Sequence, residues 1–188
     1  MENKEKEQNQ KNEPKAQEAK AAAISYRKTP VANGTLVKVI KAALSSRADN
    51  EQSWDYYVSK GKEAIRALEK DPENGMNLDH APAVIVPVYG AKDPVPTKEE
   101  VVKSTAIGNM KVIMDEIGLV GKWICVVGNE AQQKAVAETL SIASEFVPMG
   151  ILTLGYPELE DDDENLNKKK MDKGYRKKIH FVDALGRY

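Results

Sequence analysis

The 188-residue sequence contains one cysteine, two histidines and few aromatic residues. The single thiol, Cys125, excludes an internal disulfide framework and is typical of a reducing compartment. His80 and His180 have no neighbouring residues at metal-ligand spacing, so we predict no metal site. No apolar run approaches the roughly 20 residues that span a bilayer, and the N-terminus has no apolar signal segment. These absences predict a cytoplasmic protein that does not enter membranes.

The chain also has no large excess of charge of either sign, and its formal net charge is −1. The chain therefore has no strong overall field to attract nucleic acid. The N-terminal residues are mostly Glu, Lys, Gln and Asn, and burial of such side chains cannot offset their ordering entropy. We predict a disordered charged tail over residues 1–22 and one folded domain over residues 23–188. The acidic run at 158–164 and the basic run at 168–178 are expected to form a solvated loop.

Apolar residues recur with helical and strand periods along the remaining chain. Helices are predicted over 34–43, 62–68, 98–117 and 131–140, and strands over 54–58, 83–89, 123–127 and 149–156. We expect Asn33 to cap the first helix, Gly118 to end the third, and Pro87 to lie at an edge or a bulge of its strand. The alternation of helices and strands predicts an α+β or α/β sandwich, a central sheet flanked by helices.

Three groups of short motifs resemble a known family when they are taken together and in order. The first is Pro30-Val31 followed by the helix Leu36–Ala43, and the second is Asn50-Glu51-Gln52-Ser53-Trp54, similar to N-x-Q-P-W. The third combines the helix exit Ile117-Gly118-Leu119 and Trp123 with the strand end Gly155-Tyr156-Pro157. This set resembles the nitroreductase-like FMN-dependent oxidoreductase family, whose fold would be α+β with a layered central sheet.

The resemblance implies a homodimer with FMN at the subunit interface and NAD(P)H as the donor. Because the flavin ring itself accepts and releases the hydride, no catalytic side chain is needed. The leading hypothesis is an FMN-dependent oxidoreductase that passes hydride from NAD(P)H to a small electron-poor organic acceptor, a nitroaromatic or a quinone.

Cations for the flavin phosphate are expected near both ends of the domain. The family's R-R-S-x-R motif is shortened here, and Arg27 and Lys28 are either its remaining phosphate ligands or ordinary surface charges. Arg176 and Lys178 fall where the family often places C-terminal phosphate cations, although a solvated charge run also explains them.

Amide groups for the pyrimidine edge are expected after the first helix. Asn50 falls on the family's asparagine, and with Gln52 it offers the donors and acceptors that a uracil-like ring needs. A loop cap is the alternative role for Asn50, and Trp54 is expected in the core rather than against the flavin. The hypothesis requires these amides and the cations to converge on a single pocket.

Two other functions stay open. The shortened arginine motif and Ser53 in place of proline fit a degenerate relative that has lost FMN and acts as a binding or regulatory module. A nucleic-acid or structural partner bound through residues 168–178 is the weakest hypothesis, because the neighbouring acidic run screens that charge.

Overall fold

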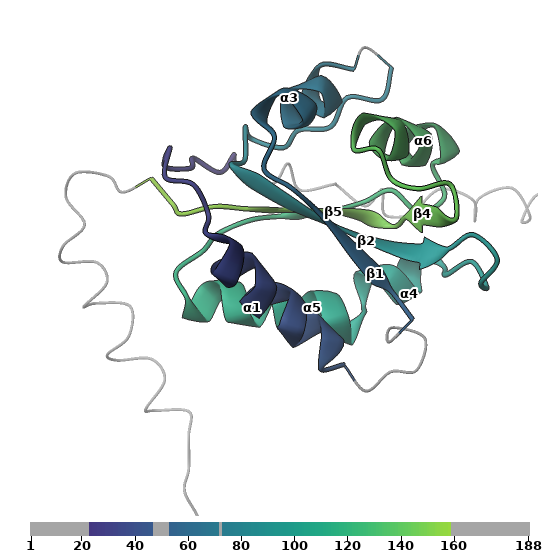
Figure 1. The fold of residues 1–188 in the computed structure, drawn as a ribbon, viewed down its shortest axis with the longest axis horizontal. Coiled ribbons are helices and arrows are strands. Elements are labelled where there is room, and N and C mark those ends of the chain that lie inside the picture. Colours follow the sequence, from purple (N-terminus) through teal and green to yellow (C-terminus); the bar gives the residue numbers. More distant parts are fainter. Residues whose placement is uncertain (1–22, 47–52, 72, 159–188) are drawn as a thin grey trace, which may run out of the picture.

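The computed structural model describes residues 23–46, 53–71 and 73–158, which form an α+β fold around an antiparallel sheet (Figure 1). The strands are β1 (Asp55–Ser59), β2 (Ala83–Gly90), β3 (Trp123–Cys125), β4 (Phe146–Pro148) and β5 (Gly150–Leu154). Their order is β1-β2-β5-β3, and β4 pairs with the end of β2 that β5 does not reach. The tail predicted over residues 1–22 and the charged runs beyond residue 158 lie outside the described residues, so both remain predictions.

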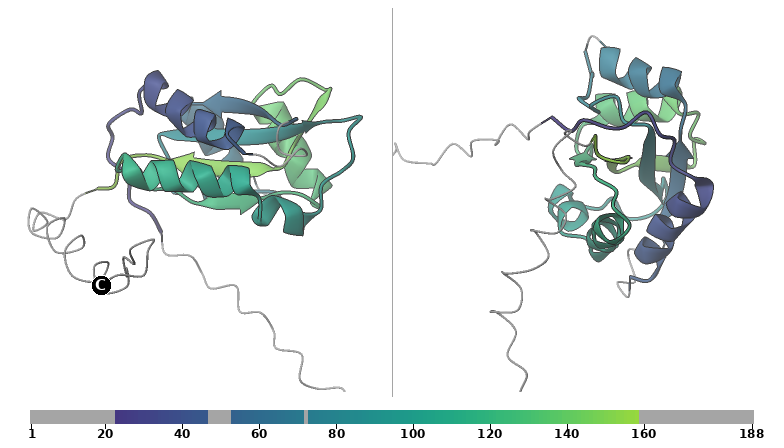
Figure 2. Two further views of the ribbon diagram at one scale, coloured as in Figure 1. Left: turned by 90° about the horizontal axis from the view of Figure 1, so that it is seen from below. Right: turned by 90° about the vertical axis from the view of Figure 1, so that its left-hand side faces the viewer.

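Helices cover both faces of this sheet (Figures 1 and 2). They are α1 (Asn33–Leu44), α3 (Lys62–Lys70), α4 (Lys98–Val102), α5 (Thr105–Glu116) and α6 (Glu130–Thr139). On one face α1 and α5 lie side by side, joined by a hydrogen bond from Asn109 Nδ2 to the Ala42 carbonyl oxygen, 3.2 Å long. On the other face α3 and α6 pack together. None of the helices in the described part of the chain has the length and apolarity needed to cross a bilayer.

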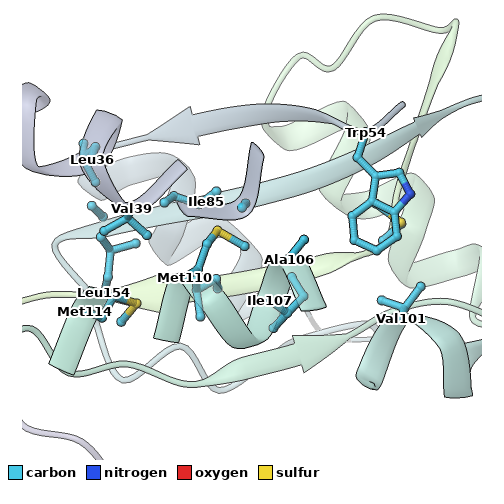
Figure 3. Packing of buried hydrophobic residues seen from close by; sticks show 14 of the residues in the cluster. Leu36, Val39, Trp54, Ile85, Val101, Ala106, Ile107, Met110, Met114 and Leu154 are labelled. Carbon is cyan, nitrogen blue, oxygen red and sulfur yellow. The ribbon is translucent and has the colours of Figure 1, made fainter. Parts of the chain in front are cut away.

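The central strand β2 explains why two cores form. Its side chains alternate, so that Ala83 and Ile85 join the core under α1 and α5, while Val84 and Val86 join the core under α3 and α6. Figure 3 shows the first of these cores, in which Met110 and Met114 of α5 pack toward the sheet. The prediction that this strand is buried on both faces is confirmed.

Pro87 lies at a bulge, as its sequence context predicted. Ile85 lies opposite Leu152, but Val88 lies opposite Pro148, so the partner strand has one residue more over this interval. The extra residue divides the partner into β4 and β5, and Met149 N–H donates to the Pro87 carbonyl oxygen at 3.0 Å. Proline has no backbone N–H to donate, and here it lies where the pairing of β2 with its partner is already interrupted.

Two sequence expectations about helices are wrong. The helix predicted over 98–117 is two helices, because the Ser104 hydroxyl accepts from Ile107 N–H and starts α5 separately. Asn33 does not cap α1 but is its first residue, and its Oδ1 accepts from Lys60 Nζ at 2.8 Å. Gly118 does end α5 as expected, with φ of +73° and the paired hydrogen bonds of a Schellman motif.

Candidate functional site

The N-terminal segment 24–28, which carries two of the predicted phosphate ligands, lies antiparallel to the residues that follow β5. Tyr26 bridges Pro157, Arg27 N–H donates to the Tyr156 carbonyl oxygen at 2.9 Å, and Glu158 N–H donates to the Ser25 carbonyl oxygen at 2.9 Å. The side chains of Arg27 and Lys28 are exposed. Neither forms a salt bridge within the part of the chain that the structure describes, so both charges are available to an anion.

A polar network anchors this segment to the sheet. The Tyr26 hydroxyl lies 2.9 Å from Thr153 Oγ1, which also accepts from Lys122 N–H at 2.9 Å. Lys122 Nζ pairs with Asp79 Oδ2 at 2.6 Å, and the same carboxylate oxygen accepts from Ile24 N–H at 3.2 Å. The side chains of Lys122 and Asp79 are only 16% and 5% exposed. The network therefore joins four segments that are distant in the sequence, at residues 24–26, 79, 122 and 153.

Burial changes the titration of two groups in this network. Loss of solvent raises the pKa of Tyr26 to about 12, so its hydroxyl stays neutral at every physiological pH. Burial alone would raise the pKa of the Asp79 carboxyl as well. The hydrogen bonds and charge of Lys122, with the Ile24 N–H, outweigh burial and hold the pKa of Asp79 below its usual value. Asp79 is consequently a carboxylate that is paired and ionised at neutral pH.

Gly155, in the Gly-Tyr-Pro motif, has a steric role in holding the segment. A Cβ atom on Gly155 would lie 2.6 Å from the Tyr26 ring and 2.6 Å from Pro82. The missing side chain thus leaves the space in which the Tyr26 ring lies. The glycine of this motif is therefore explained by the close packing of the N-terminal segment against it.

A hollow of about 940 Å³ beside this segment does not suit a phosphate. It lies between the N-terminal segment and the loop after α3, and five carboxylates line it: Glu69, Asp71, Glu73, Asp79 and Glu158. His80 also borders it, with Nδ1 2.5 Å from Glu69 Oε2. Arg27 and Lys28 are not among its lining residues. An anion at this end would therefore bind to these two cations outside the hollow.

The other predicted ligands, Asn50, Gln52, Arg176 and Lys178, lie outside the described residues. Next to the undescribed segment 47–52, a second hollow of about 300 Å³ is bordered by Trp54, Tyr89 and the loop 93–96. Trp54 is 5% exposed and belongs to the core, which confirms the expectation for this residue (Figure 3). It can therefore form a wall of this hollow but not an exposed stacking platform.

Strand register shows that these two regions lie at opposite ends of the sheet. Asp55, which follows Trp54, lies opposite Val88, whereas Leu154, close to the bridge with Tyr26, lies opposite Ala83. Five residues of β2 separate these positions, or about 17 Å at ~3.4 Å per residue. Figure 1 shows the N-terminal segment at the left of the sheet and the start of β1 at the lower right. The described residues around Arg27 and Trp54 therefore lie apart within one chain, and the convergence of Asn50 and Gln52 with the cations stays a prediction.

Most residues of the anchoring network could not be recognised from the sequence. Asp79 and Lys122 are far apart in the sequence, and neither lies in a recognisable motif. Thr153 did carry a signal, because it is a lone hydroxyl in the otherwise apolar strand Gly150–Leu154 and is fully buried. A buried hydroxyl requires hydrogen-bond partners, and here they are the Lys122 backbone and Tyr26.

Comparison with known proteins gives one curated relative and many similar structures, while no family model matches the chain. The relative is a putative NADH dehydrogenase/NAD(P)H nitroreductase from Archaeoglobus fulgidus, 29% identical over 140 residues, covering 73% of this chain and 80% of the relative. An FMN-dependent nitroreductase from Clostridium difficile R20291 has a TM-score of 0.62 at 24% identity, covering 87% of this chain and 96% of that chain.

A putative NADH oxidase from Clostridium acetobutylicum also has a TM-score of 0.62, at 22% identity, covering 86% of this chain and 96% of that chain. These structural likenesses concern the fold, and they agree with the α+β arrangement described above. The relative from Archaeoglobus fulgidus adds a sequence relationship over most of both chains. The chain therefore has a nitroreductase-like fold and is similar in sequence to one NAD(P)H nitroreductase, in agreement with the resemblance of its motifs.

Proposed function

We propose that this protein is an FMN-dependent oxidoreductase that passes hydride from NAD(P)H to a small electron-poor acceptor of the nitroaromatic or quinone class. The observation that carries the proposal is the pair of exposed cations, Arg27 and Lys28, on a firmly anchored segment of a nitroreductase-like fold. The names of similar proteins support the oxidoreductase class, since they include an NAD(P)H nitroreductase, an FMN-dependent nitroreductase and an NADH oxidase. We place the protein in the cytoplasm.

The residues at the N-terminal end fit the phosphate of FMN. An arginine guanidinium matches two phosphate oxygens, and a neighbouring lysine adds a point charge. Both side chains are exposed, and neither lines the acidic hollow. We assign Arg176 and Lys178 as further phosphate cations, and Asn50 and Gln52 as partners of the pyrimidine edge. When bound, FMN supplies the ring that accepts and releases the hydride, and the side chains of this protein bind and orient it.

A homodimer would complete the site. Because the cations and the start of β1 lie at opposite ends of one sheet, two copies related by a two-fold axis can place one end of each beside the other end of its partner. Helices α1 and α5 also carry exposed apolar side chains, with Val37, Leu44 and Val112 48%, 54% and 57% exposed. Association of two copies is a way to bury such side chains.

A flavin titration tests this function. The purified protein is incubated with FMN, freed of unbound flavin by gel filtration and examined by visible absorption. We expect a yellow protein that oxidises NAD(P)H when a nitroaromatic or a quinone is added. A protein that stays colourless, and whose NAD(P)H oxidation does not exceed that of free FMN, would overturn the proposal.

One observation favours a second candidate, a relative that has lost FMN and acts as a binding or regulatory module. Tyr26 stands within the segment that matches the family's arginine motif, yet its hydroxyl lies against Thr153 rather than toward an anion. With Ser25 and Arg27 on the serine and last arginine of the motif, Tyr26 takes its variable position, and the first two arginines have no counterpart. Sub-micromolar FMN binding together with NAD(P)H turnover would exclude this candidate.

A further inference from the structure

Lys122 is the centre of the network that holds the N-terminal segment. Its backbone N–H donates to Thr153 Oγ1, the same hydroxyl that contacts Tyr26, and its ammonium group pairs with Asp79. Asp79 in turn accepts from the backbone N–H of Ile24. Two separate routes thus connect Lys122 to the segment, one at residue 24 and one at residue 26, directly before the cations at 27 and 28.

The ion pair between Lys122 and Asp79 differs from the other salt bridges of the described residues. Lys103–Glu99 and Lys134–Glu138 are exposed i,i+4 pairs on single helices, and His80–Glu69 involves a histidine that is 81% exposed. Lys122–Asp79 is largely shielded from solvent, with side chains 16% and 5% exposed, and joins a loop to the residue that precedes β3. Exposed pairs contribute little to stability, whereas a buried pair fixes one arrangement, since separation leaves a charge without a partner in the interior.

Backbone conformation supports a specific placement of Asp79. Both Asp79 and His80 adopt φ of +53°, a region that L-residues other than glycine rarely occupy. His80 is held there by Glu69, which accepts from its backbone N–H at 2.7 Å and contacts its ring. The loop thus turns so that the Asp79 carboxylate reaches both Lys122 and Ile24.

We propose that the buried Asp79–Lys122 ion pair is a positioning device for the flavin phosphate. It holds residues 24–28 in the conformation that presents Arg27 and Lys28, and it does so without touching the cofactor. The inference rests on the proposed function and identifies what sets the phosphate affinity of that site. If the segment were free, the two cations would have to be ordered at the moment of binding, which lowers the apparent affinity by the fraction of time that the segment is correctly placed.

The test compares Asp79→Asn with Asp71→Asn, the same substitution in the same loop. The Asp71 carboxylate caps the turn at Glu73 and Asn74, and no hydrogen bond or ion pair joins it to segment 24–28 among the described residues. FMN and riboflavin are titrated into each variant, because riboflavin has the same ring without the phosphate. Loss of a positioning contact lowers only the affinity for FMN, whereas general damage to the fold lowers the affinity for both flavins.

We expect Asp79→Asn to raise the dissociation constant for FMN about tenfold and to leave that for riboflavin within about twofold, since the segment would be correctly placed about a tenth of the time. Asp71→Asn should leave both constants near those of the wild type. Hydrogen exchange in the flavin-free protein gives a second readout, in which the Ile24 and Arg27 amides lose protection in Asp79→Asn and keep it in Asp71→Asn.

If Asp79→Asn does not fold, Tyr26→Phe replaces it, because this variant removes the other anchor without unpairing a charge. The same selective loss of FMN affinity is then expected, at about threefold. An unchanged preference for FMN over riboflavin in the folded variant, or an equal loss for both ligands, would overturn the inference. A wild-type protein that binds neither flavin would instead overturn the proposed function, so the two failures are distinguishable.

Discussion

The two ends of the central sheet are built from different kinds of side chain. At the N-terminal end, Tyr26, Asp79, Lys122 and Thr153 join distant segments by polar contacts and leave cations exposed. At the opposite end, Trp54 and Tyr89 are buried, and the neighbouring loop contributes prolines and a valine, with Asp93 and Glu100 at the border of the hollow. The first end can recognise charge and the second can contact an apolar ring, which suits a ligand with a phosphate and a planar ring system.

The difference predicts that buried side chains govern stability and that exposed polar side chains govern binding. Substitutions in the aromatic end should lower the free energy of unfolding, because they remove buried apolar area. Substitutions of the exposed cations should change ligand affinity and leave unfolding unaffected, because those side chains contribute no burial. Substitutions of buried and of exposed side chains, taken from the largest expected effect to the smallest, distinguish these two contributions.

Trp54→Ala should lower the free energy of unfolding by about 3–5 kcal/mol, the usual cost of removing a buried aromatic side chain. The measurement is urea unfolding followed by circular dichroism. Val95→Ala is the matched control, since Val95 borders the same hollow but is 70% exposed and should change little. Equal unfolding free energies for the wild type and Trp54→Ala would contradict the core role of this end.

The double substitution Arg27→Ala and Lys28→Ala should raise the dissociation constant for FMN about a hundredfold, since each charged hydrogen bond to phosphate contributes about 1.5 kcal/mol or more. Urea unfolding should be unchanged, because both side chains are exposed. Fluorescence titration with FMN measures the effect. Lys62→Ala serves as the control for the loss of an exposed charge, and FMN binding as tight in the double variant as in this control would refute the phosphate assignment.

Gly155→Ala should destabilise the protein by about 1–3 kcal/mol, because the new methyl group would overlap the Tyr26 ring and Pro82. Gly108→Ala is the same change on the exposed side of α5, with no heavy atom within 4 Å of the added Cβ. This control should gain stability by up to about 1 kcal/mol through helix propensity. Thermal unfolding compares the two, and a shift of the same sign in both would exclude the packing role of Gly155.

Asn50→Ala should weaken FMN retention about tenfold if its amide pairs with the pyrimidine edge, the loss expected for one or two hydrogen bonds. Gel filtration followed by absorption measures the flavin that remains bound. Lys62→Ala again provides the comparison. The assignment of Asn50 fails when both variants retain the same amount of flavin.

The smallest expected effect is the pH dependence that Asp79 contributes. Its pKa is lower in the folded protein than in the unfolded chain, so its stabilisation is fully present above the unfolded value, about 3.9, and is lost as pH falls through the folded value. The difference in unfolding free energy between the wild type and Asp79→Asn should therefore be constant from about pH 7 to 5 and shrink below about pH 4. Urea unfolding at several pH values measures it, and a difference that grows on acidification would contradict the ion pair.

Local features of the fold could be predicted from the sequence because neighbouring residues determine them. The helix end at Gly118, the bulge at Pro87 and the buried strand Ala83–Gly90 all follow from short-range chemistry. The split of the long helix was missed because the hydroxyl of Ser104 lies within an apolar period that continues on both sides of it. Competition between a cap and a continuous helix is decided by a difference of about 1 kcal/mol, which periodicity does not reveal.

The candidate site was less accessible to sequence reasoning because its geometry is set by long-range contacts. Arg27 was selected as a candidate by resemblance to a motif, but its anchoring through Asp79 and Lys122 depends on residues that only the fold brings together. The separation between Arg27 and Trp54 depends on the registers of three strands, and no local pattern encodes those registers. The motifs alone therefore do not tell which end of the sheet each predicted ligand occupies.

The most direct test of phosphate binding by Arg27 and Lys28 is a calorimetric titration of the wild-type protein with FMN and, separately, with riboflavin. We expect FMN to bind at least about tenfold more tightly than riboflavin, because only FMN offers a phosphate to these two cations. Equal affinity for both ligands, or no heat of binding with either, would contradict it.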